Sequence, residues 1–430
     1  MEFLVRGARE FDEAGLFVSF EESPARLIEN FRSLGFGIED LIAKKKLKIS
    51  HVDLSGEEII ESGAFSLDGL LIRLERSIAE IGAKRVVLDT METFFSALSK
   101  TENLRHEIAR LFRWLSDKGV TVIITGERGK QELTRDGLEE YVSDCVLLLD
   151  HRVTEQFSKR RLRIVKYRGS AHGTDEFPFL IGETGFSVLP ITSLNLDYGA
   201  RSERVNTGVK DLDEMLAGKG YFKATAVLVT GRSGTGKSTL AAAFAVAACQ
   251  RGERCLYFSF EESAAQVIRN MKSVGIDLDP WQKKGLLTMR SSRPSFRGLE
   301  GHLLSIVHEA AKVNPTCVVM DPITNFISVG NVEDVKSMLT RILDLLKRQG
   351  ITLLMTALTS GSERPDVTEM HMSSMVDTWI ALDLELIGRG RRRILYVVKS
   401  RGMEHSHETR ELLMSSQGLS VVGLETNGKS

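Results

Sequence analysis

The sequence predicts an α/β protein made of two tandem copies of one domain, each with a mainly parallel sheet covered by helices on both faces. Three observations carry this prediction: an internal repeat, an alternation of short apolar runs with amphipathic stretches, and a glycine-rich loop between a predicted strand and a predicted helix. The chain has 430 residues, and that length accommodates two or three domains of the usual size.

The internal repeat extends along most of the chain. Its matching segments are 15–35 with 255–275, 86–89 with 318–321, and 165–169 with 398–402. The first pair aligns without gaps and is identical at 11 of its 21 positions. We therefore expect a first domain at 1–194 and a second at 195–430, joined by a linker between 189 and 204, where Pro, Asn, Asp and Gly interrupt the periodicity.

Strand-like and helix-like segments alternate in both copies. The strands expected from short apolar runs are 16–20, 86–88 and 120–124 in the first copy, and 225–230, 255–260 and 316–320 in the second. The helices expected between them include 66–81 and 239–250. Because parallel strands need crossover connections, this alternation favours a parallel sheet with both faces covered.

The loop after the strand at 225–230 reads GRSGTGKS and fits the pattern G-x-x-x-x-G-K-[ST] at every fixed position. Glycines let backbone N–H groups close around phosphate oxygens, and the N-terminus of the following helix adds its dipole. We expect Lys237 to reach the β- and γ-phosphates of a nucleoside triphosphate, and the Ser238 hydroxyl to ligate Mg²⁺. The predicted nucleotide-binding residues are Gly231, Ser233, Gly234, Thr235, Gly236, Lys237, Ser238 and Thr239.

Three acidic residues follow predicted strands of the second copy. Asp321 is expected beside the glycine-rich loop as a direct or indirect Mg²⁺ partner, with a plain strand-end aspartate as the alternative. Glu261 and Glu262 are expected to face the same crevice, where a carboxylate can accept the proton of an attacking hydroxyl or water. The alternative for one of these two is that it only caps the following helix.

The glycine-rich loop, the Ser-Phe-Glu-Glu-Ser segments, the aspartate-ended strands and the Lys-x-Arg-Gly segments together resemble the KaiC family of circadian clock proteins. These proteins are tandem RecA-like P-loop ATPases, and the resemblance covers nearly the whole chain. It implies a hexamer with ATP held between subunits, in which the second ring is an autokinase and the first an ATPase. The glutamate pair described above would then be catalytic.

The same resemblance assigns roles to two further pairs of residues. Lys399 and Arg401 would reach the γ-phosphate of the neighbouring subunit's ATP, as cations supplied across an interface stabilise a transferring phosphoryl group. Ser373 and Ser374, in the segment that follows His371, occupy the positions of the family's phosphoacceptors. Autophosphorylation of this Ser-Ser pair is therefore expected.

Two departures from the family pattern are visible. Met1 aligns with Ala241, so the first copy begins after the position of its own glycine-rich loop, as expected for a fragment, a misassigned start or a truncated paralogue. That copy would lack one core strand, which would bare apolar surface on both neighbouring strands. After Leu413 little room remains for the tail that engages KaiA, so KaiA is not expected as a partner, whereas a KaiB-like protein or a signalling kinase is a candidate.

Charge limits the alternatives to this reading. Lys and Arg number 57 and Asp and Glu 58, which gives a formal net charge of −1, so binding to nucleic acid would need a local basic patch. The segments 159–163 and 389–393 are candidates for a RecA- or DnaB-like DNA-dependent ATPase, but no aromatic residue interleaves in either. Nucleic acid is therefore not the expected partner. A nucleotide-gated scaffold without turnover is the second alternative.

Composition also indicates a location. The longest apolar run, 240–249, is about half of the roughly 20 residues that span a bilayer. The start of the chain does not resemble a signal peptide. The four cysteines, which have no metal-binding or disulfide spacing and are expected to be buried thiols, are Cys145, Cys249, Cys255 and Cys317. We expect a cytoplasmic protein without a membrane partner.

Overall fold

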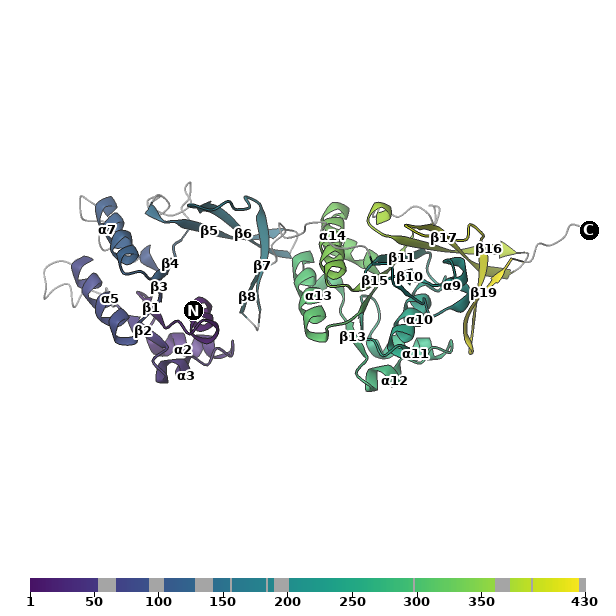
Figure 1. The fold of residues 1–430 in the computed structure, drawn as a ribbon, viewed down its shortest axis with the longest axis horizontal. Helices are drawn as coiled ribbons and strands as arrows, with labels where there is room; N and C mark the ends of the chain where they lie inside the picture. Colours follow the sequence, from purple (N-terminus) through teal and green to yellow (C-terminus); the bar gives the residue numbers. More distant parts are fainter. Residues whose placement is uncertain are drawn as a thin grey trace, which may run out of the picture. The chain divides into compact units, whose positions relative to one another are not determined.

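The computed structural model describes residues 1–52, 67–92, 104–127, 142–154, 157–182, 185–188, 201–296, 298–359, 372–387 and 390–424. The chain divides into two compact units, each of which combines sheet and helices (Figure 1). Unit 1 comprises Met1–His151 and Arg160–Val188, and unit 2 comprises Arg152–Lys159 and Leu189–Ser430. Most of the predicted linker, including the predicted boundary at 194, lies outside the described residues.

A nine-stranded sheet with the order β13-β12-β14-β15-β11-β16-β17-β18-β19 forms the centre of unit 2. Neighbours from β13 to β16 are parallel, and those from β16 to β19 are antiparallel. The strands are β11 (Ala226–Gly231), β12 (Cys255–Ser259), β13 (Leu287–Ser291), β14 (Cys317–Asp321), β15 (Thr352–Leu358), β16 (Thr378–Ile387), β17 (Gly390–Ser400), β18 (Arg410–Ser415) and β19 (Gly418–Gly423), besides the small antiparallel pair β9 (Arg204–Val205) and β10 (Tyr221–Phe222).

Helices cover both faces of this sheet, as the sequence predicts. They are α9 (Lys210–Met215), α10 (Lys237–Gln250), α11 (Ala264–Lys272), α12 (Asp279–Lys283), α13 (Leu299–Val313) and α14 (Val332–Arg348), with the 3₁₀ helices η2 (Pro294–Phe296), η3 (Ile323–Val329) and η4 (Met372–Ser374). Side chains of α10 enter the core on one face of the sheet, and those of α13 and α14 enter a second core on the other face.

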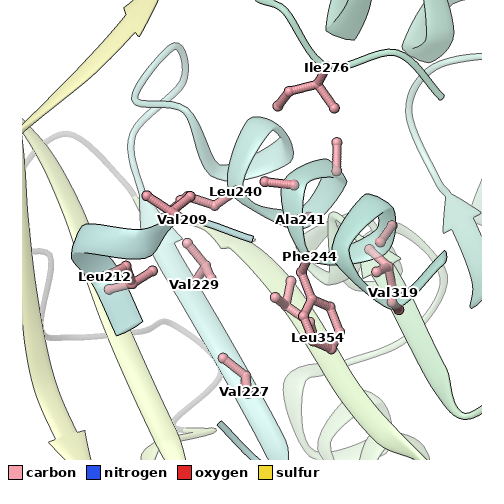
Figure 2. Packing of buried hydrophobic residues seen from close by; sticks show 14 of the residues in the cluster. Val209, Leu212, Val227, Val229, Leu240, Ala241, Phe244, Ile276, Val319 and Leu354 are labelled. Atoms are coloured by element: carbon pink, nitrogen blue, oxygen red, sulfur yellow. The ribbon is translucent and has the colours of Figure 1, made fainter. Parts of the chain in front are cut away.

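The helix α10 lies on the central strands because almost all of its side chains are small and apolar. Figure 2 shows Leu240, Ala241 and Phe244 of α10 among Val229 and Leu354 of the sheet. These residues are at most 2% exposed. The helix begins at Lys237, two residues before the predicted start, directly after the left-handed Gly236. The glycine-rich loop is therefore held between a buried strand and a buried helix.

Unit 1 repeats, in the same order, most of the elements that follow the first turn of α10, but divides its strands between two sheets. Its elements are α1 (Glu2–Glu10), β1 (Gly15–Ser19), α2 (Pro24–Arg32), α3 (Ile38–Ala43), β2 (Leu47–His51), α5 (Leu67–Ile81), β3 (Arg85–Asp89), α7 (Leu104–Asp117), β4 (Thr121–Ile124), β5 (Cys145–Thr154), β6 (Phe157–Tyr167), β7 (Glu176–Gly182) and β8 (Gly185–Val188). One sheet has the order β2-β1-β3-β4 and is parallel, and the other has the order β5-β6-β7-β8.

The division falls where β11 lies in unit 2. There β11 pairs with both β15 and β16, the counterparts of β4 and β5, whereas among the described residues β4 pairs only with β3. Ile123 of β4 is 39% exposed, and Leu147 and Leu149 of β5 are 55% and 53% exposed. Apolar surface is therefore bare on both strands, as the sequence predicts.

Cysteine burial is only partly as predicted. Cys249, Cys255 and Cys317 are buried in unit 2. The prediction was wrong for Cys145, which is exposed at the start of β5, because that strand has no described neighbour on the side where β11 covers β16. In the described part of the chain, no helix combines the length and the apolar character needed to cross a membrane.

Candidate nucleotide site

The glycine-rich loop connects β11 to α10, and two of its glycines are required, one by a close approach and the other by its backbone conformation. A Cβ on Gly231 would lie 2.5 Å from the carbonyl oxygen of Leu382 on the adjacent strand β16. Gly236 has a φ of 103°, which side-chain-bearing residues rarely adopt, and it precedes the first turn of α10. The backbone N–H groups at this helix end form the kind of cradle that binds phosphate.

Lys237 is buried at 6% exposure, and its Nζ donates a 2.8 Å hydrogen bond to the Arg232 carbonyl within the same loop. Burial lowers the pKa of Lys237 from 10.5 to about 8, although the carboxylates of Asp321 and Glu261 partly oppose this shift. Burial disfavours the charged form of this lysine, so a phosphate anion bound beside its Nζ would stabilise that charged form.

Asp321 is the last residue of β14 and is only 6% exposed. Ser238 Oγ donates to its Oδ1 at 3.1 Å, and Tyr257 OH donates to its Oδ2 at 2.8 Å. The Thr356 hydroxyl on β15 also donates to Oδ1. The carboxylate is therefore held by groups from two strands and one helix.

The sequence does not single out Tyr257 and Thr356, although one signal for Thr356 exists in the repeat. Thr125 in unit 1 occupies the position of Thr356, and its hydroxyl donates to Asp89 Oδ1 in the same way. In both copies an aspartate ends one strand and a threonine lies near the end of the following strand. This recurrence indicates that the two side chains are in contact.

The two glutamates after β12 have different surroundings. Both carboxylate oxygens of Glu262 accept hydrogen bonds of 3.2 Å from Asn270 Nδ2 on α11, and its N–H donates to Ser259 Oγ. Glu261 is exposed and close enough to Lys237 to raise its pKa. Glu261 is thus an exposed carboxylate near Lys237, whereas Glu262 is held by its own turn and by α11.

Lys399 and Arg401 lie at the other end of the sheet. In β16, Leu382 is opposite Gly231, whereas Thr378 is opposite Val227 and also opposite Ser400 of β17. At about 3.3 Å per residue, these two levels are roughly 13 Å apart along the strand. Within one chain the structure therefore does not bring Lys399 and Arg401 to the glycine-rich loop.

The serine pair lies at the same end of the sheet as Arg401. Ser373 and Ser374 belong to η4, and Arg401 Nη2 donates a 2.8 Å hydrogen bond to the Ser374 carbonyl. Ser374 is exposed, whereas the side chain of Ser373 lies outside what the structure describes, as does His371. The serine pair and Arg401 thus form one group, separate from the loop of their own chain.

The basic segment before the Lys-x-Arg strand makes contacts within its own unit. Arg392 pairs with Glu385 across the β16–β17 hairpin at 2.6 Å, and Arg393 Nε donates to the Gly234 carbonyl of the glycine-rich loop at 3.1 Å. From the sequence, this segment is a candidate nucleic-acid patch, with a solvated hairpin as the favoured interpretation. The structure shows that Arg393 instead supports the loop.

The oxygen set around Ser238 and Asp321 suits a small hard cation. Mg²⁺ is usually held by one or two side-chain oxygens together with substrate phosphates and waters. No group of three or more His, Cys, Asp or Glu residues able to hold a metal occurs among the described residues. One hydroxyl and one carboxylate beside a phosphate cradle fit a metal that arrives with its nucleotide.

The family of KaiC ATPases matches this chain over residues 1–193 and 205–426. The "Circadian clock protein KaiC2" of Synechocystis sp. is 49% identical over 424 residues, covering 98% of this chain and 75% of that protein. The "Circadian clock oscillator protein KaiC" of Parathermosynechococcus lividus is 34% identical over 426 residues, with coverages of 98% and 78%. The protein of the same name from Acaryochloris marina is 35% identical over 426 residues, with coverages of 97% and 80%.

Proposed function

The chain belongs to the KaiC family of nucleotide-binding ATPases, and from that premise we propose that unit 2 binds Mg–ATP at the glycine-rich loop, hydrolyses it, and phosphorylates Ser373 or Ser374 of a neighbouring copy. The assembly is a homo-oligomeric ring, a hexamer by analogy with the family, built from RecA-like domains at 1–194 and 195–430. Its role is signalling or clock-type regulation.

One observation carries the proposal of a shared site. Arg401 and the serine pair are together, and they lie at the end of the sheet away from the loop that would hold ATP in their own chain. A head-to-tail ring brings one end of a subunit against the opposite end of the next. Such an arrangement would place the acceptor hydroxyls and the cation beside the neighbour's γ-phosphate.

Phosphoryl transfer in this arrangement needs one proton acceptor. The acceptor hydroxyl oxygen attacks the γ-phosphorus, its proton passes to a carboxylate, and ADP leaves. Glu261 suits the role of base because it is exposed and lies near Lys237, whereas both oxygens of Glu262 are engaged by Asn270. A placed base is typically worth about 10² to 10⁴ in rate.

The bound metal supplies charge neutralisation at the phosphates. Ser238 and Asp321 would hold it, with Tyr257 and Thr356 keeping the carboxylate oriented. Lys237 would leave the Arg232 carbonyl for a phosphate oxygen. Lys399 and Arg401 would stabilise the negative charge of the transferring group from across the interface.

Co-assembly of two inactive variants tests the shared site. Lys237→Ala removes the phosphate-binding cation but keeps Arg401, and Arg401→Ala does the reverse. After random mixing at equal amounts, about a quarter of the interfaces in a ring combine an intact loop with an intact arginine. Turnover should therefore return to roughly that fraction, and intact-mass analysis should find phosphate on the Lys237→Ala chain, because that chain carries both Arg401 and the serine pair.

The control introduces Ser373→Ala and Ser374→Ala into the Lys237→Ala chain. This change should abolish the phosphate and leave the rescued hydrolysis. Phosphate found only on the chain with the intact loop, or an absence of rescue at every ratio, would show that the site is not shared. ATP hydrolysis without any phosphoprotein would reduce the proposal to an ATPase.

A further inference from the structure

Asp377 connects four elements of unit 2. It precedes β16, its N–H donates to the Ala226 carbonyl at 2.9 Å, and its Oδ2 accepts the Ala226 N–H at 2.8 Å. Lys347, near the end of α14, contacts the same Oδ2 at 2.7 Å, with side-chain exposures of 10% for the lysine and 21% for the aspartate. The Asp377 carbonyl accepts the N–H of Arg401 at 2.8 Å. Asp377 therefore fixes the backbone at the end of β17, where Arg401 lies.

Unit 1 contains the same backbone arrangement with a different ion pair. Asp144 and Arg168 occupy the positions of Asp377 and Arg401, and the Arg168 N–H donates to the Asp144 carbonyl at 2.8 Å, as in unit 2. Here the guanidinium itself reaches the aspartate, with Arg168 Nη1 lying 3.5 Å from Asp144 Oδ1. In unit 2 the guanidinium of Arg401 instead reaches the Ser374 carbonyl.

The lysine distinguishes the two copies. The strands β4 and β15 align through Thr121 and Thr352, which are opposite Arg85 and Cys317, the first residues of β3 and β14. Extended toward the N-terminus without gaps, the same alignment matches the end of α7 with the end of α14. Ser116 then stands at the position of Lys347. Unit 1 thus has no lysine at this place to contact its aspartate.

We propose that Lys347 is a positioning residue for phosphoryl transfer: by occupying the Asp377 carboxylate, it keeps the guanidinium of Arg401 directed to the acceptor segment and the neighbouring subunit. The inference rests on the proposed shared site and adds to it a residue that touches neither nucleotide nor acceptor.

Charge balance provides the physical reason. A half-buried carboxylate gains most from a cation in direct contact. Besides Lys347, Asp377 has two cations close by, Lys399 of β17 and Arg401 directly after it. The environment of Lys399 shows this proximity: burial and then Arg401 lower its pKa, Asp377 raises it, and Lys347 lowers it again. Without Lys347, Asp377 would attract Lys399 and Arg401 and turn them away from the neighbouring subunit.

The test is Lys347→Met in the full chain, with Lys347→Ser as a second variant that copies unit 1. Because a cation supplied in trans is worth about 10³ to 10⁵ in rate, its misdirection should reduce turnover and phosphorylation about tenfold or more. ATP affinity should be unchanged, since the loop lies at the other end of the sheet. Adding Arg401→Ala to Lys347→Met should cost much less than Arg401→Ala alone, because the two changes damage the same interaction.

A second-site change separates positioning from general stability. Asp377→Asn removes the competing charge but retains an oxygen for the Ala226 N–H, so Lys347→Met with Asp377→Asn should recover most of the lost rate. Lys336→Met, on the same helix, is the matched control and should be near wild type. Normal turnover of Lys347→Met, or full additivity with Arg401→Ala, would overturn the inference alone, whereas an Arg401→Ala protein with wild-type turnover would overturn the shared site as well.

Discussion

The two units of this chain share their local contacts but differ in burial. In both, the serine that ends the strand before the glutamate pair holds the turn, with Glu22 and Glu262 donating to Ser19 and Ser259 through their N–H groups. In both, an asparagine eight residues later donates to the second glutamate. These contacts span few residues, so the same short sequence reproduces them wherever it stands.

Burial depends instead on β11, which pairs with β15 and β16 in the sheet although it comes before both of them, and before β12, in the chain. Residues of β15 are buried between β14 and β11, whereas β4 is bare on the side away from β3. The repeated sequence thus determines turns and local contacts in both units. How much an apolar residue of these strands contributes to stability depends instead on whether β11 covers it. Matched substitutions in the two units can measure this difference.

Leu354→Ala and Ile123→Ala form the pair with the largest expected difference. The alignment that matches Thr121 with Thr352 makes Ile123 the equivalent of Leu354. Leu354 is 0% exposed, whereas Ile123 is 39% exposed. We expect Leu354→Ala to cost about 2 to 5 kcal/mol of unfolding free energy and Ile123→Ala about 1 kcal/mol or less. Urea unfolding, with the unit 2 transition identified by its response to ATP, provides the measurement. Equal losses would contradict the proposed role of β11.

Thr356→Val and Thr125→Val compare the two aspartate contacts. Both hydroxyls donate to a strand-end carboxylate, but only that of Thr356 lies beside the glycine-rich loop. Loss of a buried hydrogen bond to a charged group costs about 1.5 to 3 kcal/mol, so turnover of Thr356→Val at limiting Mg²⁺ should fall about tenfold or more. Thr125→Val should remain within about twofold of wild type. A similar loss in both variants would mean that unit 1 contributes to turnover.

The smallest expected effect concerns the pH dependence of ATP binding. With a pKa of about 8, Lys237 is charged in the free protein below that pH and neutral above it. Bound phosphates favour the charged form, so ATP affinity should be level below pH 8 and fall by up to about tenfold per pH unit above it. Calorimetric titration from pH 7 to 9.5 would measure this. Lys237→Arg should abolish the slope because arginine stays charged, and a slope that persists would assign it to another group.

Much of the fold follows from the sequence alone, since the signals are local. The repeat, the buried β11 strand, the glycine-rich loop and the strand-end position of Asp321 are each visible in a few consecutive residues, because backbone periodicity and turn geometry act over short distances. The predicted strand and helix bounds differ from the observed ones by only one or two residues, as for α10. Apolar surface on β4 and β5 also follows from the sequence, since the repeat reveals which strand has no counterpart.

The tertiary structure decided what depends on strand order and side-chain direction. It separates Glu261 from Glu262, adds Tyr257 and Thr356 to Asp321, and exposes Cys145. It also places Arg401 with Ser374, away from its own loop, and gives Asp377 to Lys347 rather than to the arginine. The contacts of Asp321, Arg401 and Asp377 could not be read from any single segment of the sequence, because they join residues of separate strands and helices that only the tertiary fold brings within hydrogen-bonding distance.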